Sequence, residues 1–87
     1  MITLLAPMLV RAAARPLSDD AIYDMVRRRL ANDPLVKGGA LEIEVKEGTV
    51  TLRGDVELAK QKEKAEKVAR KVSGVKQVIN ELRVTRR

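Results

Sequence analysis

The spacing of apolar residues changes along the chain, and each change predicts a new element. Apolar side chains first recur at helical spacing after Ser18, at Ile22, Val26 and Leu30. Ser18 followed by two aspartates is typical of a helix start, because these side chains accept hydrogen bonds from first-turn amides. Pro34 has no backbone N–H to donate, so the helix is expected to stop at about Asn32 and Asp33.

The period then becomes two, which indicates strands. Leu41, Ile43 and Val45 alternate with charged residues up to a turn signal at Glu47-Gly48, and the same alternation continues through Leu52. This pattern predicts a β-hairpin with one buried and one solvated face. Glycine tolerates backbone conformations that other residues avoid, so Gly48 suits the tight turn and Gly54 is expected at the strand exit.

A helical period returns over residues 57–72, followed by a final strand over about 77–85. The apolar side of this second helix is formed by Leu58, Ala65, Val68, Ala69 and Val72. Gly74 is expected to end it in the left-handed cap conformation. In the last strand Asn80 interrupts an apolar face, where it is expected to hydrogen-bond backbone groups in a turn or at a strand end.

The element order predicts an α+β fold: a single small αββαβ domain, with a three-stranded mixed sheet and two helices packed on one face. Residues 1–17 precede this domain, which occupies 18–87. Within them Ile2–Val10 is apolar but too short to span a bilayer, so no transmembrane span is expected. This stretch is either an apolar arm that packs on the domain or a neighbouring chain, or the remnant of an export signal that lacks a basic start.

Composition argues against an enzyme and against a metal or cofactor site. The 87 residues contain no Cys and no His, which removes disulfides, the usual zinc ligands and the commonest general bases. The net charge is +6, so partners with negative charge are expected. Specific nucleic-acid binding is not expected, because Tyr23 is the sole aromatic residue and stacking platforms are missing.

The basic residues predict two candidate anion-binding surfaces. On a helical wheel a line of lysines lies opposite the apolar side of the second helix: Lys60, Lys64, Lys67 and Lys71. On the first helix Arg27 and Arg28 point outward, whereas Arg29 lies near the apolar edge, where its stem packs and its head reaches water. Ordinary solvated helix faces remain an alternative interpretation of both surfaces.

Two motifs carry a family resemblance. They are Gly-x-Val-x-Leu-x-Gly over residues 48–54 and Gly-Val-x-x-Val-x-Asn-x-Leu-x-Val over 74–84, and Ala65-x-x-Val68-Ala69 lies between them. With the first helix, this ordered set resembles the BON domain over about residues 18–85. The resemblance implies an αββαβ fold without a shared catalytic motif, in bacterial envelope or osmotic-stress proteins thought to bind phospholipid surfaces. In some members the first helix contacts the membrane, which adds weight to Arg27 and Arg28.

The sequence therefore favours a non-catalytic module that docks on anionic phospholipid through the basic helix faces. The alternative is a structural protein that forms a homo-oligomer through Ile2–Val10 and an exposed sheet edge. The resemblance implies the periplasm or cell envelope, and a cytoplasmic location stays open because no clear signal peptide is seen.

Overall fold

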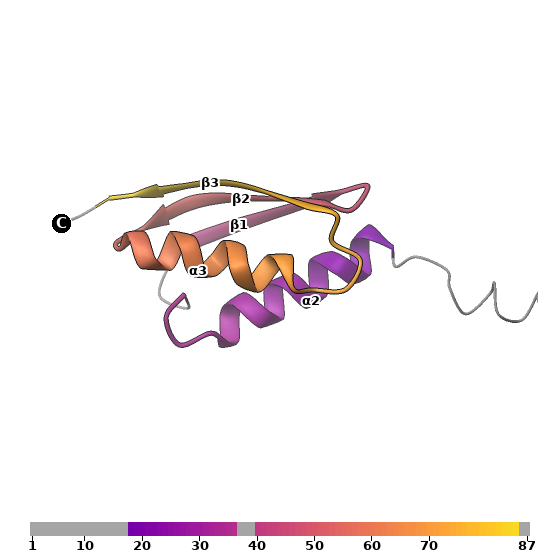
Figure 1. Cartoon of the computed structure of the whole chain (residues 1–87), viewed down its shortest axis with the longest axis horizontal. Coiled ribbons are helices and arrows are strands. Elements are labelled where there is room, and N and C mark those ends of the chain that lie inside the picture. Colours follow the sequence, from indigo (N-terminus) through magenta and orange to yellow (C-terminus); the bar gives the residue numbers. More distant parts are fainter. Residues whose placement is uncertain (1–17, 37–39, 86–87) are drawn as a thin grey trace, which may run out of the picture.

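Two helices cover one face of a three-stranded sheet in the computed structural model (Figure 1). The structure describes residues 18–36 and 40–85, so the predictions made for residues 1–17, including Ile2–Val10, lie outside the described residues. The elements follow the order α2 (Asp19–Asn32), β1 (Ala40–Lys46), β2 (Thr49–Val56), α3 (Ala59–Arg70) and β3 (Gln77–Val84). This order confirms the predicted αββαβ fold class.

The sheet is mixed, with β2 in its centre. β1 and β2 form an antiparallel hairpin in which Lys46 pairs with Thr49 across a two-residue turn. β2 and β3 run parallel, so the chain crosses over through α3 before it returns to the sheet. Strands β1 and β3 are therefore the two edges of the described sheet.

The hairpin turn is tied to the start of α2. Gly48 takes a positive φ of 82°, which suits a tight hairpin turn. The Asp19 carboxylate accepts hydrogen bonds from the backbone amides of Glu47, at 2.8 Å, and Gly48, at 3.1 Å. At the same helix end the Ser18 hydroxyl accepts from the Ala21 amide at 3.2 Å, as an N-cap residue does. Helix α2 therefore begins beside the closed end of the hairpin.

Two glycines lie at places other than those the sequence predicts. Gly54 does not end its strand: it pairs with Leu41 and Leu82 inside β2, which runs on to the buried Val56. Its φ of 130° explains why glycine is needed there, since residues with a side chain rarely adopt that conformation. Gly74, with φ of 94°, lies in the turn beyond α3, which ends earlier, at Arg70.

The core lies between the helices and the sheet. It is built from buried aliphatic residues of every described element except β1, and it holds no buried polar side chain: Ile22, Val26, Leu30, Val36, Val50, Leu52, Val56, Ala65, Ala69, Val72 and Leu82. Helix α3 turns its two buried alanines toward the core.

Asn80 joins α3 to β3 from within the strand. Its side-chain amide donates to the Lys62 carbonyl at 2.9 Å and to the Glu66 carboxylate at 3.2 Å, while its oxygen accepts from the Leu82 amide at 3.1 Å. The prediction of a turn or strand-end position was therefore wrong, although the side chain does bind backbone groups. A half-buried polar side chain is tolerated on this face because its hydrogen bonds are satisfied.

Candidate anion-binding site

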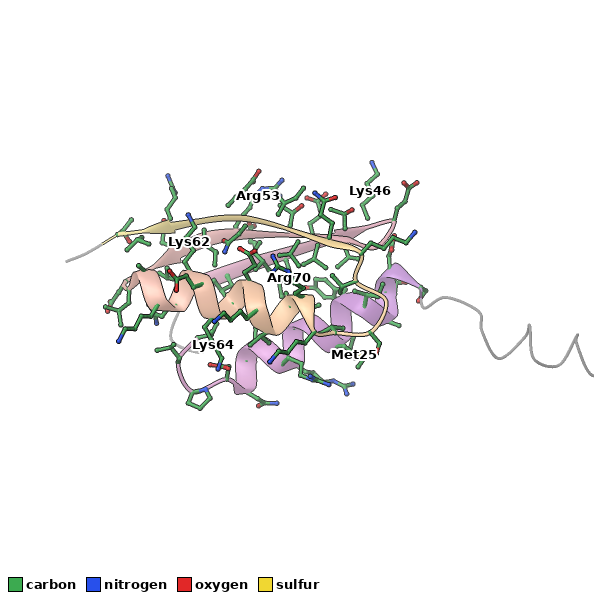
Figure 2. The ribbon with its side chains drawn as sticks, in the orientation of Figure 1. Met25, Lys46, Arg53, Lys62, Lys64 and Arg70 are labelled. Carbon is green, nitrogen blue, oxygen red and sulfur yellow. The ribbon has the colours of Figure 1, made fainter. Side chains whose placement is uncertain are left out.

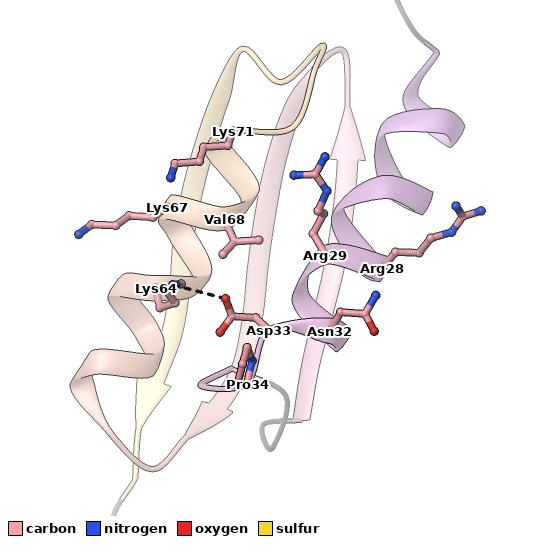
Figure 3. Close-up of a pocket in the computed structure, with 9 residues that line it drawn as sticks. All are labelled: Arg28, Arg29, Asn32, Asp33, Pro34, Lys64, Lys67, Val68 and Lys71. Carbon is pink, nitrogen blue, oxygen red and sulfur yellow. Dashed lines mark ion pairs between the residues drawn. The ribbon is translucent and has the colours of Figure 1, made fainter.

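A groove of about 720 Å³ runs between α2 and α3 on the side away from the sheet. Figure 3 shows the side chains that line it: Arg28, Arg29, Asn32, Asp33, Pro34, Lys64, Lys67, Val68 and Lys71. Five of these nine side chains are basic and one is acidic, so the groove has a strong excess of positive charge. We call it the basic groove.

The helical repeat explains why these cations gather. Lys64, Lys67 and Lys71 are spaced by three and four residues, which places them along one flank of α3. Arg28 and Arg29 come from the last turns of α2, on the opposite flank. In Figure 3 Val68 points into the space between the helices, whereas Lys67 and Lys71 extend away from it. The cations thus border an open groove whose interior is partly apolar.

Most of this charge is not neutralised within the domain. Lys64 approaches the Asp33 carboxylate at 3.5 Å, and Arg28 pairs with Asp24 one turn earlier at 2.7 Å. Among residues 18–36 and 40–85, no ion pair or hydrogen bond engages the side chains of Arg29, Lys67 and Lys71. Three cations around the groove are therefore available to an external anion.

Asp33 fixes the end of the groove where α2 stops. One carboxylate oxygen accepts from the backbone amides of Leu35, at 2.9 Å, and Val36, at 3.2 Å, which closes the turn after the helix. Burial opposes the charge of this carboxylate, but the two amides and the Lys64 ammonium outweigh it and lower the pKa of Asp33. Asp33 therefore holds Lys64 in place as a permanent anion at neutral pH.

The structure gathers four of the six predicted anion-binding residues and separates two. Arg28, Lys64, Lys67 and Lys71 all line the basic groove, but Lys60 does not. Arg27 lines a different groove, beside β1, because it projects from another side of α2. A straight wheel of one helix shows which lysines share a line, but it does not show where the second helix packs against that line.

Arg29 lines the basic groove although the sequence did not predict it as an anion-binding residue. Its position near the apolar edge of the first helix predicted that its stem packs and its head reaches water. In the structure that edge borders α3, so the exposed guanidinium lies at the groove. A residue at the boundary between apolar and polar faces is the signal that could have identified it.

The open face of the sheet has a balanced charge pattern. Arg53, near the centre of that face in Figure 2, donates to Glu44 at 2.9 Å and to Glu81 at 3.0 Å, and Arg83 pairs with Asp55 at 3.2 Å. Its hydrogen bonds to Glu44 and Glu81 raise the pKa of the Arg53 guanidinium. These cross-strand pairs neutralise one another, so the unpaired positive charge is greatest on the helical side.

The described residues contain no group of acidic, Cys or His side chains that could hold a metal ion. Within the same part of the chain, none of the helices has the length and apolar character needed to cross a bilayer.

Comparisons with known proteins agree with this fold. The family model described as BON domain matches residues 18–86. The chain is also 34% identical, over 65 residues, to the osmotically-inducible protein Y of Escherichia coli (strain K12). That alignment covers 75% of this chain and 32% of the relative, so the chain spans about a third of that protein's length. With a family match that covers the whole described region, this chain belongs to the BON-domain family.

Proposed function

We propose that this chain is a non-catalytic binding module that docks on anionic phospholipid surfaces through the basic groove. The observation that carries the proposal is the set of three cations at an open groove that are unpaired among the described residues: Arg29 on the α2 flank, and Lys67 and Lys71 on the α3 flank. A lipid surface presents many anionic headgroups side by side, which suits charges that border a groove better than charges that converge on one point. Each basic residue near an anionic surface contributes about 1 kcal/mol.

Family membership supports the same proposal and adds a setting. The relative from Escherichia coli is named for osmotic induction, and we extend this to a stress role for the present chain in the bacterial cell envelope. The charge difference between the helical side and the balanced sheet face also favours one orientation on a membrane, with the helices toward the lipid.

Co-sedimentation with vesicles tests the proposal. The full chain is expected to bind vesicles that contain phosphatidylglycerol, to bind neutral phosphatidylcholine vesicles far less, and to lose binding as salt rises. The salt effect follows because attraction between exposed charges is screened beyond about 10 Å at 0.1 M ionic strength. Equal binding to neutral vesicles would contradict the proposal.

Two matched double variants test whether binding depends on the basic groove or only on the net charge of the chain. Lys67→Gln with Lys71→Gln removes two groove cations, which costs about 2 kcal/mol and weakens partitioning roughly 30-fold. Arg27→Gln with Lys60→Gln removes the same charge outside the groove and is expected to weaken binding much less. If both pairs weaken binding equally, only the net charge matters and the groove is not the docking site.

A further inference from the structure

The outer edge of β1 carries a second groove, separate from the basic groove. This groove, of about 470 Å³, is lined by Tyr23 and Arg27 of α2, by β1 from Leu41 to Glu44, and by Arg53. No other described strand pairs with this side of β1, because β1 is an edge of the sheet. An edge strand presents backbone N–H and C=O groups in the alternating pattern that another strand can join. We call this site the β1 edge.

The helical side of the β1 edge is apolar and incompletely covered. Leu41 and Ile43 are half-buried, whereas Leu52, the partner of Ile43 in the central strand, is completely buried. Tyr23, the sole aromatic residue of the chain, is 41% exposed beside them. The apolar layer under the sheet thus continues to the edge without being closed there, so additional apolar side chains could extend it.

Among the described residues, the open side of the β1 edge carries one unpaired carboxylate, that of Glu42. Glu42 and Glu44 point away from the helices, and Glu44 is engaged by Arg53 at 2.9 Å. Glu42 makes no ion pair or hydrogen bond with the part of the chain that the structure describes. A free carboxylate next to an unpaired strand favours a basic side chain directly across from it, since opposite charges on neighbouring strands attract.

We propose that the β1 edge takes up an extended segment of a partner protein as a fourth strand. The segment carries apolar side chains at alternate positions, which lie over Leu41 and Ile43, and a Lys or Arg between them, which pairs with Glu42. Backbone hydrogen bonds supply affinity and the alternating side chains supply specificity. Arg27, on the helical side, offers an additional contact for a carboxylate of the same segment.

A second copy of this chain fits the β1 edge less well through its own β1. With Ile43 opposite Ile43 in an antiparallel pair, Glu42 of each copy faces Glu44 of the other. Like charges directly across a pair of strands are destabilising. The charge pattern therefore favours a basic segment of another protein over self-pairing.

The test uses the full chain and a capped seven-residue peptide in which valine and lysine alternate. Because the chain itself carries +6, general electrostatic attraction does not favour this peptide. We expect saturable binding, with amide chemical-shift changes and slowed hydrogen exchange over residues 41–45 and little change over β3. A version with glutamate in place of lysine, and one N-methylated at alternate backbone positions, are expected to bind at least about tenfold more weakly, because they remove the charge pairing or the backbone bonds.

A charge reversal on the protein completes the test. Glu42→Lys leaves every described ion pair intact and is expected to weaken the lysine peptide about tenfold and to strengthen the glutamate peptide. Glu63→Lys, with the same charge change on α3, serves as the matched control and is expected to change neither peptide. Both variants are compared with the original chain by thermal unfolding, so a folding defect is recognised directly.

Three results would overturn the proposal. One is that no saturable binding is seen up to about 1 mM peptide, where a specific strand addition should be detectable. Another is that binding is not strand addition at β1, as shown by equal binding of the N-methylated peptide or by changes centred on β3. The third is that residues 41–45 are already protected in a dimer or in the free chain, which would assign the β1 edge to a second copy or to residues 1–17.

Discussion

At the scale of single residues, the hairpin turn contains a position that is not optimised. Glu47 adopts a φ of 50°, although it is not a glycine. A left-handed conformation costs a residue with a side chain about 1–2 kcal/mol, and asparagine tolerates it better. Asparagine followed by glycine is also the preferred pair for a two-residue hairpin turn. We expect Glu47→Asn to raise the free energy of unfolding by about 0.5–1 kcal/mol, measured by urea denaturation.

The next residue supplies the control for this prediction. Gly48 has φ of 82°, and a Cβ built there would lie 3.0 Å from side-chain carbons of Lys76 and 3.3 Å from the Gly74 carbonyl oxygen. Gly48→Ala is therefore expected to destabilise the domain by roughly 1–3 kcal/mol. If both substitutions lower the urea midpoint, the turn conformation assigned to Glu47 is wrong.

Asp33 makes stability depend on acid pH. Its pKa lies below the ordinary value of about 3.9. The charged form therefore contributes stability that is present above that ordinary value and is lost as pH falls through the lower folded pKa. Asp33→Asn keeps a side-chain oxygen but removes the charge. We expect the stability difference between the original chain and this variant to be constant near neutral pH and to disappear in acid, as followed by urea denaturation between pH 7 and pH 2. A difference that does not change with pH would contradict this.

At the scale of elements, one side chain links α2 to the hairpin. The Asp19 carboxylate accepts hydrogen bonds from two backbone amides of the turn, 28 and 29 residues further along the chain. Hydrogen bonds to a charged group contribute about 1.5–3 kcal/mol, and the amides lose them when the partner is removed. Asp19→Ala is expected to lower the free energy of unfolding by roughly 1–3 kcal/mol.

Asp20 offers a matched control for that substitution. It lies in the same first turn, is exposed, and has no hydrogen bond within the described part of the chain. Asp20→Ala removes the same charge from the helix N-terminus and is expected to cost less than about 1 kcal/mol. Equal losses for the two alanine variants would assign the effect to the helix dipole and not to the link with the hairpin.

The helices and strands were predictable from the sequence because each of them turns one apolar side toward the core. The change from helical to alternating spacing reports which side of the backbone meets the core, and this information is local. The end of β2 was not predictable, since Gly54 keeps its place in the strand by pairing on both sides, with Leu41 and Leu82. The role of Asn80 was not predictable either, because its hydrogen bond to the Lys62 carbonyl depends on how β3 packs against α3.

The basic groove was predictable only in part, for the same reason. The lysine line could be read from the sequence of one helix, but the contribution of Arg28 and Arg29 depends on how α2 packs beside α3. Arg27 and Lys60 show the opposite case. On the wheel of its own helix each looks equivalent to the basic residues of the groove, yet both lie outside it. A site formed between two elements is therefore only half visible in the pattern of either one.

At the scale of the whole molecule, charge is distributed unequally between two faces. The open sheet face carries a nearly even mixture of acidic and basic side chains: Glu42, Glu44, Lys46, Arg53, Asp55, Glu81 and Arg83. The helical side carries the basic groove with its three unpaired cations. An anionic surface would therefore attract the molecule with its helices forward, and the β1 edge would remain free at the side for a partner segment.

The proposed docking through the basic groove is tested most directly by measuring which face of the molecule meets the lipid. The ¹H–¹⁵N spectrum of the full chain is recorded with anionic lipid nanodiscs that carry a paramagnetic headgroup label. If the basic groove meets the lipid, signal broadening is strongest in the last turns of α2 and over Lys64–Lys71, and weak over the strands. Broadening centred on the open face of the sheet, or spread evenly over the domain, would contradict docking through the basic groove.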